Sequence, residues 1–136
     1  MSALQEQLHI DEVSGLDPDA PVVMLNLLKF RAKSLDGHGS GWDAYSRYSA
    51  NTVPLIKARG GTIIWAGSIL ALTLGSIMDG NWDYAVLVWY PSPTAFLDMM
   101  ASPEYAKGNV DRENGTERHL VLATHMEYSK LATPVG

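Results

Sequence analysis

Hydrophobic residues fall into short apolar runs and helical stripes that alternate along most of the chain. Runs rich in Val, Leu, Ile and Trp predict strands at 22–30, 62–77 and 82–90, and a last strand is expected at 119–126. Apolar and aromatic residues spaced three and four apart predict a helix at 42–59, between the first two strands. The first half of the chain therefore reads as strand, helix, strand.

Two serine–proline pairs mark the second helical region. Ser92-Pro93 and Ser102-Pro103 each place a capping hydroxyl before a proline, which suits the first position of a helix. A helix is therefore expected from Pro93, with a restart at Pro103 and an end near Gly115. The full order is strand, helix, strand, strand, helix, strand. It predicts an α+β domain of the ferredoxin-like βαββαβ type, with an antiparallel sheet and its helices on one face.

This domain should occupy residues 21–128, after an N-terminal extension at 1–20 and before a C-terminal tail at 129–136. A short amphipathic helix is expected at 3–14, laid over the core. The predicted strands are nearly continuous apolar runs, so both faces of the sheet need cover. Helices cover one face, and a second copy of the chain is the simplest cover for the other. We therefore expect a symmetric homodimer with the sheets face to face.

Composition narrows the possible partners and chemistry. The net charge is −5 and no basic stripe is present, so no nucleic-acid partner is expected. The chain has no cysteine and no metal-binding spacing of His, Asp and Glu, so no metal and no cofactor are expected. The uncharged run at 60–78 contains several glycines and is better explained as sheet than as a membrane span. The start of the chain does not read as a signal peptide, and a cytoplasmic protein is expected.

Asn26 and two tyrosines are the first candidates for a ligand site. Asn26 is a neutral polar side chain in the middle of an apolar strand, and leaving it buried and unpaired would cost about 1–3 kcal/mol. Its partner is either the neighbouring backbone or a ligand. Tyr45 and Tyr48 share one face of the 42–59 helix. They either pack in the core or line a pocket for an aromatic or carbonyl ligand.

Three further residues have a functional and a plain interpretation. Lys29, near the end of the first strand, either attracts a carboxylate or is solvated surface. His119 is the candidate for acid–base catalysis because imidazole titrates near neutrality, and the alternative is a surface or interface histidine. His38 lies in the glycine-rich loop 31–41, which is flexible and is a candidate lid over a pocket.

Several segments together resemble the domain-of-unknown-function family 1330 over about residues 21–126. They are VVMLNLLKF, Tyr45-x-x-Tyr48 with Val53-Pro54-Leu55, Gly60-Gly61, WDYAVLVWYPSPTAF and SPEY. The resemblance implies a dimeric α/β-barrel fold but no particular activity. The wider superfamily includes cofactor-independent monooxygenases, haem-degrading enzymes, muconolactone isomerase-like proteins and polyketide cyclases. Its monooxygenases use an Asn and a Trp between sheet and helices. By this analogy Trp65 joins Asn26 as a ligand-binding candidate, and plain core packing is the alternative.

Two functional hypotheses remain. The first is a small cofactor-independent enzyme, of the monooxygenase or isomerase kind, that acts on an aromatic or carbonyl compound. Asn26 and Trp65 would orient the substrate, and Tyr48 or His119 would move a proton. The second is a dimeric domain without catalysis that binds a small ligand or is purely structural. The absence of a recognisable acid–base pair favours the second hypothesis, and the combination of buried polar and aromatic residues favours the first.

Overall fold

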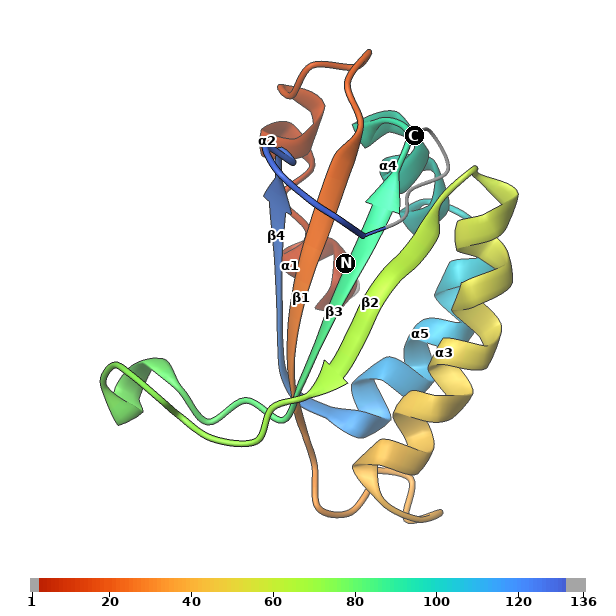
Figure 1. Cartoon of the computed structure of the whole chain (residues 1–136). Coiled ribbons are helices and arrows are strands. Elements are labelled where there is room, and N and C mark those ends of the chain that lie inside the picture. Colours follow the sequence, from red (N-terminus) through yellow and green to blue (C-terminus); the bar gives the residue numbers. More distant parts are fainter. Residues whose placement is uncertain (1–2, 132–136) are drawn as a thin grey trace.

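The computed structural model describes residues 3–131 of the chain, which form a four-stranded sheet with helices packed against it (Figure 1). The strands are β1 Val22–Phe30, β2 Thr62–Ser68, β3 Tyr84–Tyr90 and β4 Thr116–Thr124. The helices are α1 Ala3–Gln7, α2 Ile10–Ser14, α3 Gly41–Ala58, α4 Pro93–Met100 and α5 Pro103–Gly115, with a 3-10 turn at Ile77–Asp79. None of the helices within residues 3–131 has the length and apolar character needed to cross a membrane.

The sheet has the ferredoxin-like strand order. Its four strands run in the order β2-β3-β1-β4, and every neighbouring pair is antiparallel. The two central strands, β1 and β3, are thus brought together across a connection that contains α3 and β2. The predicted α+β ferredoxin-like class is confirmed, and the predicted bounds of β1 agree with the structure.

Strand alternation separates the sheet into two faces. Asn26 of β1 lies opposite Val86 of β3 and Val121 of β4, and these residues face the helices. Met24 and Leu28 share this inner face and are almost fully buried. The core continues through Val88 and Tyr90 of β3 to side chains of the helices, namely Tyr48, Ile56, Phe96, Met99 and Tyr105.

Side-chain caps fix where the helices begin. Ser40 accepts a hydrogen bond from the backbone N–H of Asp43, and the Asp43 carboxylate accepts one from the N–H of Ser40. The hydroxyls of Ser92 and Ser102 cap α4 and α5 by accepting from the backbone N–H groups of Ala95 and Tyr105, and each serine is followed by a proline. The predicted restart of the helix at Pro103 is therefore confirmed.

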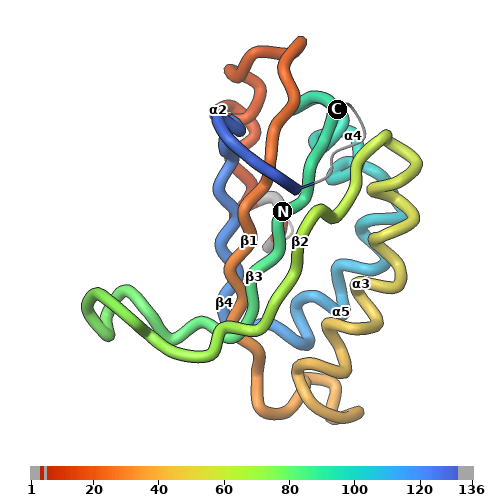
Figure 2. The backbone as a smooth tube through the Cα atoms, in the orientation of Figure 1, coloured from red at the N-terminus to blue at the C-terminus, as the bar shows by residue number. Residues whose placement is uncertain are grey.

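Two expectations about element lengths were wrong. The predicted strand 62–77 ends at Ser68, and residues 69–83 form an arm that projects away from the sheet (Figure 2). A bulge in this strand lies between Ile63 and Trp65. The predicted helix 3–14 is two short helices, α1 and α2, separated at residues 8–9. Of the predicted tail, residues 132–136 lie outside the described part.

Glycines allow three elements to meet at one end of the sheet. The backbone N–H of Gly41 donates to the carbonyl of Arg31, and the N–H of Arg31 donates to the carbonyl of Gly115. The start of α3, the end of α5 and the chain leaving β1 therefore touch through their backbones. A methyl group on Gly115 would lie 2.9 Å from the Tyr45 backbone nitrogen and 3.1 Å from the Ala44 side chain, and it would also overlap the Gly41 carbonyl.

We therefore expect Gly115→Ala to lower the free energy of unfolding by about 1–3 kcal/mol, because rigid backbone must shift to admit the methyl group. Gly15→Ala is the matched control, since its methyl group would lie at ordinary contact distance, 3.4 Å from the Asp11 carbonyl. The control should change stability by less than about 0.5 kcal/mol. Urea unfolding followed by circular dichroism measures both. Equal effects of the two substitutions would contradict the close approach of α3 and α5.

Candidate functional site

A cavity of about 700 Å³ lies between the inner face of the sheet and the helices. This volume is within the range of small-molecule sites. Its walls are mainly apolar and come from the sheet, α3 and α4, with residues such as Met24, Val86, Ile56 and Phe96. The N-terminal helices α1 and α2 close one side, through Leu4 of α1 and Val13 of α2, together with Leu8 between them. The predicted N-terminal extension is thus part of the cavity wall.

Asn26 lies on the sheet side of this cavity with its amide held on both sides. Its Nδ2 donates to the carbonyls of Met24 (3.2 Å) and Val86 (3.4 Å). Because carbonyl oxygens only accept, these contacts orient the amide and leave Oδ1 as an acceptor. Oδ1 lies 2.9 Å from Nε2 of His119. Asn26 therefore has protein partners and still lines the cavity.

The contact with Asn26 also defines the tautomer and the charge of the His119 ring. Since Oδ1 of Asn26 accepts, Nε2 of His119 carries the proton and donates it. The other ring nitrogen, Nδ1, lies 3.2 Å from Nη1 of Arg112, which can only donate. The ring is thus neutral, with one nitrogen donating and one accepting. Burial, and next the positive charge of Arg112, lower the pKa of His119 from 6.5 to about 3.

Arg112 of α5 is the buried charge of the site. Only 7% of the residue is exposed, and it lines the cavity. Besides His119, its guanidinium donates to Oδ1 of Asn109 at 2.7 Å and to Oε1 of Gln7 at 3.3 Å. All three acceptors are neutral. Within residues 3–131, no carboxylate forms an ion pair with Arg112.

Two tyrosines add a second polar pair. The hydroxyls of Tyr48 and Tyr105 lie 2.9 Å apart, and both residues line the cavity and are buried. Burial raises the pKa of both phenols. Tyr45 also lines the cavity, and burial raises its pKa as well. All three phenols are therefore neutral near pH 7 and serve as hydrogen-bonding and aromatic wall, not as phenolate bases.

One polar atom in the cavity wall lacks a partner. The Oγ1 of Thr52, one turn after Tyr48 on α3, is buried and has no hydrogen-bond partner among the described residues. Such an atom costs free energy unless water or a ligand satisfies it. It is a further point at which a bound molecule would gain a contact.

The structure separates the other predicted site residues from this cavity. Trp65 lies on the outer face of the sheet, where it pairs with Leu87, and 45% of it is exposed. Lys29 forms an ion pair with Asp83 at 3.3 Å. His38 is exposed in the loop before α3 and does not line the cavity. The site thus joins Asn26, His119, Tyr45 and Tyr48, but not Trp65, Lys29 or His38.

Arg112 and Asn109 were not among the predicted site residues. A charged residue in a polar helix reads as solvent-exposed, and α5 has little apolar character. The spacing of residues along α5 nevertheless indicates which side of this helix faces the core. Tyr105, Asn109 and Arg112 follow one another by four and three positions, which places all three on one helical face. An aromatic residue on that face indicates that it points inwards.

Within residues 3–131, no three His, Asp or Glu side chains gather in a way that could hold a metal ion. The polar groups that do converge are amide, imidazole, guanidinium and phenol. This set can hold an oxygen-bearing ligand by hydrogen bonds. The neutral His119 has both ring nitrogens engaged, so proton transfer through it would require one of these bonds to break.

Known proteins include a family and several solved structures to which this chain is similar. Residues 41–126 match the model of a family described as Domain of unknown function (DUF1330). The search of curated proteins gave no match. Among solved structures, RPA0582, a protein of unknown function from Rhodopseudomonas palustris, is 26% identical with a TM-score of 0.80, and the match covers 89% of this chain and 91% of that one.

Two enzymes share the fold at lower identity. A hydroxynitrile lyase from Passiflora edulis is 14% identical with a TM-score of 0.59, over 82% of this chain and 98% of that one. A mutant form of SnoaB from Streptomyces nogalater, described as a cofactor-independent oxygenase, is 14% identical with a TM-score of 0.51, over 81% of this chain and 96% of that one. These likenesses concern the fold.

The neutral state of His119 gives a prediction for pH dependence. Below pH 6.5 the unfolded chain binds a proton on His119 that the folded chain, with a pKa of about 3, does not bind. The contribution of His119 to the free energy of unfolding is therefore fully present above pH 6.5 and is lost as the pH falls towards 3. Allowing for solvent in the cavity, we expect the wild type to lose about 1–2 kcal/mol more than His119→Gln between pH 6.5 and pH 5.

Urea unfolding of both proteins at pH 5, 6 and 7 measures this difference. The other titrating groups are shared, so they cancel in the comparison of the two proteins. The stability gap between wild type and His119→Gln should narrow as the pH falls. A gap that stays constant would show that His119 titrates in the folded protein as it does in the unfolded chain, and a gap that widens would show that folding raises its pKa. Either outcome would contradict the prediction.

Proposed function

Since the chain belongs to the family described as Domain of unknown function (DUF1330), we propose a function from the site itself: the protein binds a small aromatic or carbonyl compound in its cavity. The observation that carries this proposal is the convergence of the His119–Asn26 pair and Arg112 on one cavity with apolar walls. Small-molecule sites combine such walls with a few placed polar groups that orient the ligand.

The walls suit a flat, apolar ligand body. Tyr45 lies in a group of aromatic rings with Phe30, Trp42 and Tyr84, whose centroids are 5.1–6.2 Å from that of Tyr45. This group continues into a smaller hollow between α3 and the sheet that shares Tyr45 and Ser49 with the main cavity. An aromatic ring would find edge and face contacts there.

We assign the reaction, as part of this proposal, to cofactor-independent chemistry on the bound carbonyl compound. Arg112, which has two N–H groups besides those that donate to Asn109, His119 and Gln7, holds the oxygen end. Tyr48 and His119 are the candidates to move a proton. The fold is compatible with such chemistry, because SnoaB is described as a cofactor-independent oxygenase. This support is analogy at the level of the fold.

Binding without catalysis is a second candidate, and a specific observation favours it. Both nitrogens of His119 are engaged and its pKa is about 3, while burial raises the pKa of Tyr48. No group in this set is thus a ready base at pH 7. Following the NMR signals of a bound ketone for several hours under air separates the two candidates. New signals indicate a reaction, and unchanged signals indicate binding only.

The outer face of the sheet supports a further part of the proposal, the homodimer. Trp65, Leu120 and Leu122 are exposed there by 45%, 41% and 47%. The neighbouring arm at 69–83 carries Leu70 and Leu74, exposed by 95% and 92%. Apolar surface of this extent is rare on an isolated protein. A second copy of the same sheet covers it with matching apolar residues.

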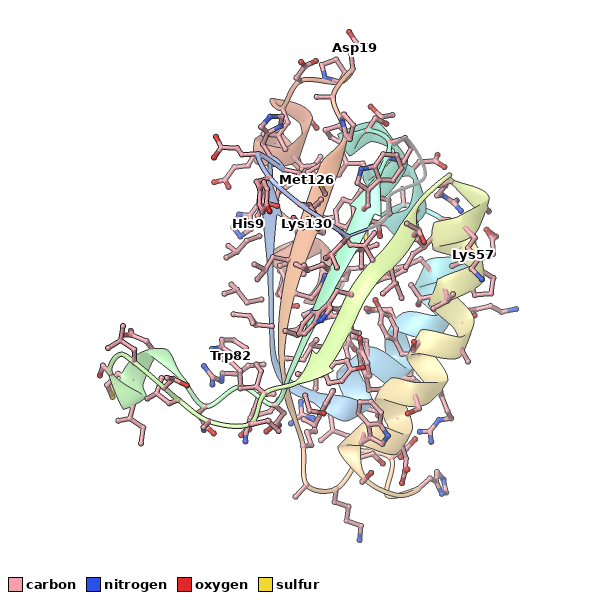
Figure 3. The ribbon with its side chains drawn as sticks, viewed as in Figure 1. His9, Asp19, Lys57, Trp82, Met126 and Lys130 are labelled. Carbon is pink, nitrogen blue, oxygen red and sulfur yellow. The ribbon has the colours of Figure 1, made fainter. Side chains whose placement is uncertain are left out.

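The arm is anchored at its base, so it presents these leucines in a defined direction. Arg118 donates to the carbonyls of Gly80 and Asn81. Its guanidinium carbon lies 4.1 Å from the ring centroid of Trp82, which is labelled beside the arm in Figure 3. The backbone N–H of Ile69 also donates to the carbonyl of Asp83. An arm held in this way extends the apolar surface beyond the sheet.

Filling the cavity should abolish ligand binding. We expect acetophenone and 2-acetylnaphthalene to shift the NMR signals of cavity residues such as Val121, which faces the cavity from the edge strand β4. Val121→Trp should weaken this binding at least tenfold because the indole occupies the space. Val110→Trp is the matched control, since Val110 is exposed on α5 and does not line the cavity. Binding that survives in Val121→Trp would contradict the assigned site.

Light scattering after size-exclusion chromatography tests the homodimer. We expect a dimer at about 10 µM for the wild type and a monomer for the double variant Leu70→Ser/Leu122→Lys, because a buried unpaired charge and lost apolar contacts disfavour association. Val110→Lys changes an apolar residue on the helical side that is exposed by 59%, and this variant should remain dimeric. A monomeric wild type at this concentration would contradict the proposed homodimer.

A further inference from the structure

Arg112 is a buried cation whose protein partners do not neutralise it. Three of its five N–H groups donate to neutral oxygen or nitrogen atoms, from Asn109, His119 and Gln7. The nearest acid in this network is Glu113, which accepts from Nδ2 of Asn109 and so is separated from Arg112 by the amide. Glu12 lines the cavity but is exposed and forms no ion pair with Arg112 among the described residues.

Burying an ion without a counter-ion is costly, by several kcal/mol even after relaxation. Arg112 is 7% exposed, so water reaches little of it directly. A guanidinium that served only to brace α5 against β4 would fulfil this role with a carboxylate partner at lower cost. The remaining two N–H groups belong to a side chain that lines the cavity.

The hydrogen bonds that link Arg112 to the sheet all run in one direction. Arg112 donates to His119, His119 donates to Asn26, and Asn26 donates to the carbonyls of Met24 and Val86. The chain therefore begins at a positive charge and ends in backbone acceptors, and no member of it can offer a negative charge to Arg112. The charge remains directed at the cavity, where low polarity strengthens its attraction for an anion.

We propose that the cavity takes its ligand as an organic anion, a small carboxylate with an aromatic or unsaturated apolar body, and that Arg112 is its counter-ion. The planar fork of the guanidinium matches the two oxygens of a carboxylate. The apolar body lies against the tyrosines and the sheet. This inference rests on the proposed function, because it names the chemical class of the ligand that the same cavity binds.

A matched pair of probes tests the charge. The compounds 2-naphthoate and 2-naphthamide have the same shape, and only the first is negatively charged at pH 7. NMR titration of the wild type should give an affinity for 2-naphthoate at least tenfold higher than for 2-naphthamide. Equal affinities would overturn the inference and leave the proposed ligand pocket in place. Failure of both compounds, and of the neutral ketones, would remove the proposed function together with the inference.

Substitutions assign the preference to Arg112. Arg112→Met should abolish the preference for 2-naphthoate, and Arg112→Lys, which keeps the charge but not the fork, should retain it with weaker binding. Lys107→Met is the control, since Lys107 is exposed on the same helix and its loss changes the net charge equally. A preference that persists unchanged in Arg112→Met would overturn the assignment. If Arg112→Met does not fold, an unchanged affinity of Arg112→Lys for 2-naphthoate would overturn the assignment instead.

The imidazole of His119 gives a second readout that requires no substitution. Arg112 contributes to the low pKa of His119, so an anion bound to Arg112 should offset part of that effect. At pH 7, where 2-naphthoate carries its charge, saturating 2-naphthoate should shift the ¹⁵N signal of Nδ1 of His119, because the anion competes for the guanidinium that donates to this nitrogen. Saturating 2-naphthamide should shift this signal less. Equal responses to both probes would contradict an anion beside Arg112.

Discussion

The hydrogen-bond chain from Arg112 through His119 to Asn26 is the constraint on which the site depends. It joins α5, the edge strand β4 and the central strand β1 at the polar end of the cavity. Each bond fixes the next, because the guanidinium can only donate and the carbonyls beyond Asn26 can only accept. The orientation of the amide and the tautomer of the imidazole follow from these two ends. A cluster of this kind is stable only when every member is satisfied, which is why a buried charge with no counter-ion among residues 3–131 stands out.

The rest of the fold positions this chain and keeps space beside it. Contacts between the glycines at 41 and 115 bring the start of α3 close to the end of α5, so Tyr48 and Tyr105 meet across the two helices. The N-terminal helices close a side of the cavity that the four-stranded sheet leaves uncovered. Apolar wall and polar end therefore come from different parts of the sequence. The cavity is a consequence of how the helices are spaced, not of any single motif.

Local patterns were sufficient to predict most of the fold. The apolar run of β1, the serine–proline caps of α4 and α5 and the order of elements led to the ferredoxin-like sheet, because each is a short-range signal. The site was only partly predictable. Asn26 and His119 were recognised by residue type, but their contact spans 93 positions and needs the strand register. Arg112 was missed because charge in a polar helix usually means exposure, and only its spacing from Tyr105 indicated the inner face.

Trp65 shows how one irregularity redirects a side chain. In an uninterrupted strand Ile63 and Trp65 would share a face, and Ile63 does line the cavity. The bulge between them shifts the register, so Trp65 pairs with Leu87 and lies on the outer face. Gly67 supports this placement, because a methyl group there would lie 2.7 Å from the indole ring, which therefore rests over the glycine. A single extra residue in β2 thus moves a large aromatic side chain from the cavity to the outer face of the sheet.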